Sequence, residues 1–326
     1  MKNKYLFAAV MLCAILIVGM GLTTLYVNSS QETQTDHTLT VVTSFYPMYI
    51  AADNIIDGAD GVRLENLSEP QTGCLHDFQL TPEDMKLLST ADVFIINGGG
   101  IETFMKKVAA AYPDLTVIEA CEQTELLPET DGDSHDHDHE NEDEDHEDNE
   151  DNEDVNAHAW MSIPAYETQV NAIAQGLSAA DPSRSSLYTQ NEKTYRDKLE
   201  TLRKRQDKLK EKLKGEPVIL FHEAYAYVAE DYGLDVKYLL NLDEERQISA
   251  GEVSDVISAV KNDHTNYILA EKLYGKSMGD TIEKETGVTV LYLDPLNRGD
   301  YDKDSYIDGM TKNMDLLEEA FYAKNH

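Results

Sequence analysis

Basic residues are scarce in this chain: 27 Lys and Arg stand against 62 Asp and Glu, giving a formal net charge of −35. A surface with this balance repels phosphate backbones and anionic lipid headgroups, which argues against nucleic acid as a partner. Cations are instead the natural small ligands. Long hydrophobic runs are also scarce, because the only one that could span a bilayer lies at the start of the chain.

That run extends without a charge from Tyr5 to Val27, after two early lysines. It exceeds the ~20 residues needed to cross a bilayer, so we expect residues 1–27 to be a retained membrane anchor, with a cleaved signal as the alternative. Either reading places the remainder outside the cytoplasm, attached to the outer face of the membrane or secreted into the periplasm. Residues 28–38 are polar and are predicted to form a tether.

Cysteine is rare, with three in the whole chain. Cys13 lies in the hydrophobic run, and lipid attachment there is disfavoured because Leu12 occupies a position where a small residue is expected. Cys74 and Cys121 are the other two. Outside the cytoplasm they can form a disulfide, or they can remain two buried thiols, and the sequence leaves both readings open.

From residue 39 onward, strand-like and helix-like segments alternate twice, at 39–182 and at 216–326. Such alternation predicts parallel sheets covered by helices on both faces. Residues 183–215 contain no proline and carry apolar residues at helical spacing, so they predict one long helix. The expected fold class is therefore α/β, with two four-stranded parallel-sheet lobes joined by a long rigid helix.

The segment from Glu129 to Asp154 holds 16 acidic residues and no Lys or Arg. It has almost no apolar residues, so we expect residues 129–155 to form a disordered loop within the first lobe. Its histidines stand among carboxylates and could hold metal ions weakly; they are His135, His137, His139 and His146.

Four other residues of metal-ligand type lie at the ends of predicted elements. His76 is in the loop after the strand at 62–67, and His158 lies between the acidic loop and a helix. His222 and Asp294 each follow a strand of the second lobe. Ligands of parallel α/β sheets bind beyond the carboxyl ends of strands, so together these residues suggest a site. Taken singly, each histidine could be a solvated loop residue and the aspartate a turn residue.

The chain resembles the substrate-binding proteins of bacterial ABC importers for zinc and manganese, the ZnuA-like family. The motifs that carry this resemblance are CLHDFQLTPEDMKLLSTADVFIINGGGIETFMKKV, NAHAWMS, VILFHEAYAYVAEDYGL and TVLYLDPL, and it covers nearly everything from Leu39 onward. Where family members have DPHVW this chain has NAHAW, which keeps the histidine and the tryptophan but puts the loop conformation in doubt.

The resemblance implies that His76, His158, His222 and Asp294 bind one metal ion in the cleft between the lobes. Manganese members typically have Glu at the position of His222, and three imidazoles favour Zn²⁺ over Mn²⁺. It further implies that the protein captures the ion, delivers it to a membrane permease and acts as a monomer. In this reading the acidic loop collects ions for the cleft.

Three alternatives accompany this reading. A manganese-binding protein of the same family would share the fold. A metal-dependent surface adhesin or extracellular metal buffer is possible in principle, but no residues here encode a receptor site. A zinc hydrolase is disfavoured because a His₃Asp set closes the coordination sphere and the chain has no HExxH motif or other spare acid/base motif.

Overall fold

A computed structural model describes residues 38–69, 75–76, 78–129, 155–242 and 248–323. Residues Thr40–His326 form one compact unit, which contains the candidate site and both sheets apart from the first residue of β1. Among the described residues no helix is long and apolar enough to cross a membrane. The predicted anchor at residues 1–27 lies outside the described part of the chain and stays a prediction.

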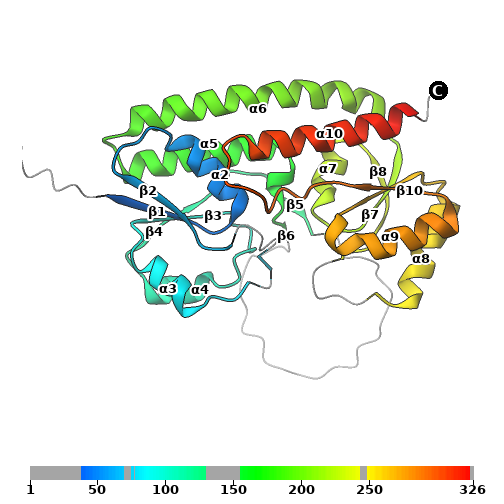
Figure 1. The fold of residues 1–326 in the computed structure, drawn as a ribbon, viewed down its shortest axis with the longest axis horizontal. Helices are drawn as coiled ribbons and strands as arrows, with labels where there is room; N and C mark the ends of the chain where they lie inside the picture. Colours follow the sequence, from blue (N-terminus) through cyan, green and yellow to red (C-terminus); the bar gives the residue numbers. More distant parts are fainter. Residues whose placement is uncertain (1–37, 70–74, 77, 130–154, 243–247, 324–326) are drawn as a thin grey trace, which may run out of the picture. The chain divides into compact units, whose positions relative to one another are not determined.

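The first sheet has four strands in the order β2-β1-β3-β4 (Figure 1). Its strands are β1 (Leu39–Thr43), β2 (Val62–Asn66), β3 (Val93–Ile96) and β4 (Thr116–Glu119). The central strand β3 pairs in parallel with both β1 and β4 and is buried along its whole length, as its VFII sequence predicts. One face is covered by helices α3 (Pro82–Leu88) and α4 (Met105–Ala111), and the other by α2 (Tyr46–Ile55) and α5 (Ile163–Ala180).

The second sheet repeats this plan, with strands in the order β10-β9-β7-β8 and parallel pairing throughout. Its strands are β7 (Pro217–Leu220), β8 (Asp235–Leu239), β9 (Tyr267–Ala270) and β10 (Thr289–Tyr292). Helices α8 (Ala250–Asn262) and α9 (Lys272–Thr286) pack apolar side chains on one face, while α7 (Tyr225–Tyr232) and α10 (Ser305–Ala323) lie on the other. The predicted pair of four-stranded parallel sheets is thus confirmed.

Helix α6 (Ser185–Leu213) is the long predicted helix and contacts both halves of the protein. Its 29 residues span about 44 Å at 1.5 Å per residue. Its buried side chains recur every three or four residues, so one face packs along its whole length; they are Tyr188, Glu192, Tyr195, Leu199, Leu202, Gln206, Leu209 and Leu213. Toward the first half α6 packs on α2 and α5, and toward the second on α7 and α10 (Figure 1).

A small antiparallel pair lies in the first half of the chain, between β4 and α5, and was not predicted. Strands β5 (Leu127–Pro128) and β6 (Val155–Asn156) have two residues each, with Leu127 opposite Asn156. Strands this short show no readable alternation of polar and apolar residues. The pair joins the two ends of the acidic segment and fixes the chain directly before His158.

The chain between β10 and α10 returns to the first half and is bonded there. Tyr46 Oη donates to the carbonyl oxygen of Asp300 over 2.7 Å, and Asn54 Nδ2 donates to that of Lys303 over 2.8 Å. At the start of α10, the Tyr306 ring stacks on Tyr166 with centroids 3.8 Å apart. The two halves are therefore held together by side chains as well as by α6.

Candidate metal centre

His158 is the buried centre of the candidate site, with 1% of its surface exposed. It follows β6 and precedes the short helix η1 (Ala159–Met161). Asn156 Nδ2 donates to the carbonyl oxygen of Glu223 over 2.8 Å, so its Oδ1 faces His158 as an acceptor. That oxygen lies 3.1 Å from the backbone nitrogen of His158 and 2.9 Å from its Nδ1. Nδ1 therefore carries the ring proton, and Nε2 presents a lone pair for a metal ion.

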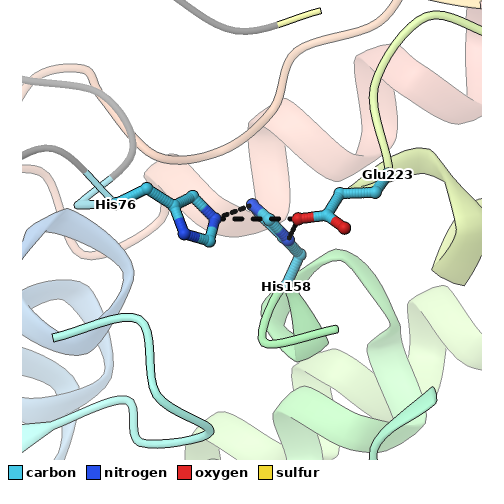
Figure 2. A group of neighbouring side chains, drawn as sticks. All are labelled: His76, His158 and Glu223. Carbon is cyan, nitrogen blue, oxygen red and sulfur yellow. Dashed lines mark hydrogen bonds and ion pairs between the residues drawn. The ribbon is translucent and has the colours of Figure 1, made fainter. Parts of the chain in front are cut away.

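His76 approaches His158 from the loop after β2. Its Nε2 lies 3.4 Å from His158 Nε2, and its side chain is 43% exposed (Figure 2). Two imidazole nitrogens that bind zinc at 2.0–2.1 Å in tetrahedral geometry lie about 3.3–3.4 Å apart. The separation of the two nitrogens therefore equals one edge of a zinc coordination tetrahedron.

His222 directly follows β7 and brings a third imidazole from the second half. Its ring centroid lies 5.0 Å from that of His158, with the planes at 88°. The backbone N–H of Ala224 donates to His222 Nδ1 over 3.0 Å, so the neutral ring carries its proton on Nε2, and that nitrogen could bind an ion only after the bond to Ala224 is released and the ring proton moves. The rings of His76 and His222, from separate parts of the chain, thus both lie beside the His158 ring, although His222 is not part of the closest group of ligand atoms.

Glu223, the next residue, was not predicted and belongs to the same group. Its carboxylate oxygen Oε1 lies 3.5 Å from His158 Nδ1 and 3.7 Å from His76 Nε2 (Figure 2). The residue is 6% exposed. Ligand atoms of His76, His158 and Glu223 all lie within 4.8 Å of one another, as expected of a metal site. The only sequence signal was the position of Glu223 beside His222 at a strand end.

Asp294 lies at the carboxyl end of β10, where it was expected, but its carboxylate faces its own turn. Oδ1 accepts the backbone N–H of Leu296 over 2.9 Å, and Leu296 has a positive φ of 56°. The backbone of Asp294 is bonded at both its N–H and its carbonyl oxygen to Asn313 of α10. Asp294 is not part of the group formed by the two histidines and Glu223, and its role as a ligand stays a prediction.

Burial determines the protonation state of His158. Its pKa is held well below the ordinary value of 6.5, first by burial and then by the neighbouring His222 and His76. The imidazole is therefore neutral at physiological pH, which is the form that binds metal ions.

A second layer of buried hydrogen bonds fixes the loop that carries His158. Asn97, after β3, donates from Nδ2 to the carbonyl oxygen of Ala157 over 2.9 Å. The Glu102 carboxylate accepts the backbone N–H groups of Asn97 and Gly98 at 2.8 and 3.0 Å. Burial raises the pKa of Glu102 to about 7 even though these bonds and one from Ser44 oppose the rise.

Trp160, the chain's only tryptophan, connects His158 to the Asp294 turn. The indole lies 5.0 Å from the His158 ring between centroids, and its Nε1 donates to the carbonyl oxygen of Pro295 over 2.9 Å. The side chain is fully buried. A change in the position of either site residue would therefore be transmitted to the indole.

Most of the remaining predicted residues lie outside the part of the chain that the structure describes. His135, His137, His139 and His146 lie outside the described residues, as does Cys74. Cys121 is a buried free thiol whose pKa burial raises to about 12, and Gln169 Nε2 lies 3.0 Å from its sulfur. The pairing of Cys74 with Cys121 stays a prediction.

The protein has two parallel α/β halves on one long helix, and histidines from both halves lie close together. This arrangement is typical of metal-binding substrate-binding proteins. Residues 41–320 match the family described as ZnuA, zinc-uptake complex component A, periplasmic, and the chain belongs to that family. The resemblance seen in the motifs is thereby confirmed.

Individual relatives bind different metals. The chain is 28% identical to the high-affinity zinc uptake system protein ZnuA of Bacillus subtilis (strain 168) over 322 residues, which cover 96% of each chain. It is 23% identical to the manganese-binding lipoprotein MntA of Halalkalibacterium halodurans over 326 residues, 97% of this chain and 98% of that one. Among solved structures, FpvC of Pseudomonas aeruginosa in complex with Mn²⁺ matches with a TM-score of 0.73 and 26% identity, over 88% of this chain and 99% of that chain.

Proposed function

We propose that this protein captures Zn²⁺ outside the cytoplasm and delivers it to the membrane permease of an ABC importer. The observation that carries the proposal is the grouping of three imidazoles, with the rings of His76 and His222 both beside that of His158. One of these imidazoles is buried, neutral and oriented by Asn156. The name of the Bacillus subtilis relative, a zinc uptake protein similar along nearly its full length, supports the same function.

Zinc is favoured over manganese because imidazole suits Zn²⁺, whereas Mn²⁺ prefers oxygen ligands. The carboxylate of Glu223 beside the histidines is the one observation that favours manganese as a second candidate. The manganese-binding relative from Halalkalibacterium halodurans makes that candidate worth testing directly.

The proposed mechanism is capture and release without catalysis. Three imidazoles and one carboxylate can complete a tetrahedral zinc site, which leaves no position for the water molecule that a zinc hydrolase activates. Helix α6 packs against both halves, so we expect the halves to move little when the ion binds. The acidic segment, residues 129–154, is proposed to collect ions weakly and raise their concentration near His158.

Zinc titration of the purified full-length chain tests this function, by competition with a chelating dye. We expect one tight site, which His222→Ala weakens strongly and which deletion of residues 132–154 leaves intact. His264→Asn is the matched control, because His264 is exposed and its positive φ of 53° suits asparagine. If the deletion abolishes tight binding and His222→Ala does not, the site has been assigned to the wrong residues. A parallel titration with Mn²⁺ separates the two metals.

A further inference from the structure

We propose that Glu223 is itself a ligand of the captured ion, beside His76, His158 and His222. This inference rests on the proposed metal-binding function and specifies which carboxylate completes the site. It differs from the ligand set expected from the sequence, in which Asp294 supplies the only oxygen.

The distances around Glu223 fit coordination better than hydrogen bonding. Its Oε1 lies 3.5 Å from His158 Nδ1 and 3.7 Å from His76 Nε2, and both separations exceed an ordinary hydrogen bond. His158 Nδ1 already has the oxygen of Asn156 at 2.9 Å. Neighbouring ligands of one zinc ion lie about 3.3–3.4 Å apart, so the 3.7 Å between Oε1 and His76 Nε2 is within a few tenths of an ångström of the separation of two ligands, whereas His158 Nδ1 carries the ring proton and would not bind the ion.

The backbone of Glu223 is held in place from both halves of the protein. Its N–H donates to Asn241 Oδ1 over 3.3 Å, and its carbonyl oxygen accepts from Asn156 Nδ2 over 2.8 Å. Asn156 thus bonds to His158 and Glu223 together and fixes the distance between them. A carboxylate buried at such a position is expected to be paired or to bind a metal ion.

Asp294 is arranged differently, because its carboxylate already accepts a hydrogen bond within its own turn. Its Oδ1 closes the turn at Leu296, and its Oδ2 faces α10, 3.5 Å from where a Cβ on Gly309 would lie. No ligand atom of Asp294 belongs to the group formed by His76, His158 and Glu223, so its carboxylate would have to move to reach an ion held there. Glu223 already belongs to that group.

The full-length chain loaded with Co²⁺ provides the test, because the visible absorption of cobalt reports its coordination directly. Glu223→Gln keeps the size of the side chain and removes its charge. Loss of an outer-shell partner typically costs about 10–100-fold in metal affinity, so loss of a ligand should weaken Zn²⁺ binding by about 100-fold or more and change the cobalt spectrum. Glu230→Gln, on the exposed face of α7, is the matched control and should change neither. If Glu223→Gln does not fold, Glu223→Asp withdraws the carboxylate by one methylene and should show the same two effects.

The outcomes separate this inference from the proposed function. Weaker zinc binding together with an altered cobalt spectrum supports Glu223 as a ligand. Wild-type affinity, or weaker binding with an unchanged spectrum, overturns it, and the second result would make Glu223 a positioning residue. If the wild-type chain binds neither metal at one tight site, or His158→Ala binds normally, the proposed function itself fails.

Discussion

Replacing Asn156 with alanine should damage zinc binding and folding together, although Asn156 is not expected to touch the ion. The substitution removes one oxygen that faces two nitrogens of His158, and one N–H₂ group that donates to Glu223. Without that oxygen the His158 ring has no fixed tautomer. Either ring nitrogen can then carry the proton, and the ring can rotate away from the ion.

The expected losses of stability and of zinc affinity follow from the burial of Asn156 and His158. Asn156 is 1% exposed and His158 is equally buried, so water is not positioned to replace the lost partners. Each buried polar group left unsatisfied costs about 1–3 kcal/mol, and three such groups put the loss of stability in the metal-free protein at about 3 kcal/mol or more. That is a large part of a typical total of 5–15 kcal/mol. Zinc affinity should fall by about 10–100-fold, the usual effect of removing an outer-shell partner of a ligating histidine.

Two measurements check this prediction: thermal unfolding of the metal-free protein, and zinc competition with a chelating dye. Asn171→Ala is the control, because Asn171 Oδ1 accepts a hydrogen bond from Gln175 Nε2 at the exposed surface of α5, away from the site. Asn156→Asp should separate the two effects, since it keeps the acceptor for His158 but turns an oxygen toward the Glu223 carbonyl. It should lose stability and retain much of the zinc affinity. Wild-type zinc affinity in Asn156→Ala would refute the idea that Asn156 orients His158.

Three further predictions concern pH, fluorescence and a buried acid. Zinc affinity should fall as the pH drops below ~6.5, where protons compete for imidazole, and less steeply than three ordinary imidazoles would require, because burial already lowers the pKa of His158; isothermal titration across pH 5–7 measures the protons released on binding. Fluorescence of Trp160 should change on zinc addition and saturate at one equivalent, and a signal that keeps changing would place the reported site elsewhere. The pKa of Glu102 is raised to about 7 in the folded protein, so between pH 4.5 and 7 the folded state keeps a proton that the unfolded state has lost. Glu102 therefore lowers the stability of the fold as the pH rises from about 4.5 toward 7. Melting curves should show that Glu102→Gln removes this decline and costs about 1–3 kcal/mol, because its amide N–H₂ would face the N–H of Gly98.

The helices and strands could be predicted because the residues within and directly beside each element carry the pattern typical of it. Strand β3 is a continuous apolar run, α6 contains no proline, and Thr81 caps α3, so each of these elements follows from residues close to it in the sequence. Helix α9 (Lys272–Thr286) contains Gly275, a residue that ordinarily weakens a helix. In the structure Gly275 packs closely on the adjacent strand, where an added Cβ would lie 3.1 Å from Ala270.

The chemistry of the site was only partly predictable. The three histidines could be identified because each lies at the end of an element. Glu223 could not, since successive strand residues point to opposite faces and only one of the pair 222–223 would be expected to face the site. In the structure both residues lie in a turn after β7, where that alternation no longer holds. Glu102 was missed for another reason: nothing local marks a carboxylate that becomes buried beneath the His158 loop.

The two-residue ladder of β5 and β6 has a consequence for how this protein can evolve. Because the ladder ties Pro128 to Val155, residues 129–154 can be lengthened, shortened or replaced without moving His158. For a flexible insert, each doubling of length adds only about 0.6 kcal/mol of closure cost. Selection can therefore change the number of histidines and acids in this segment to suit the metal supply of a habitat, while the ladder keeps the chain before His158 in place.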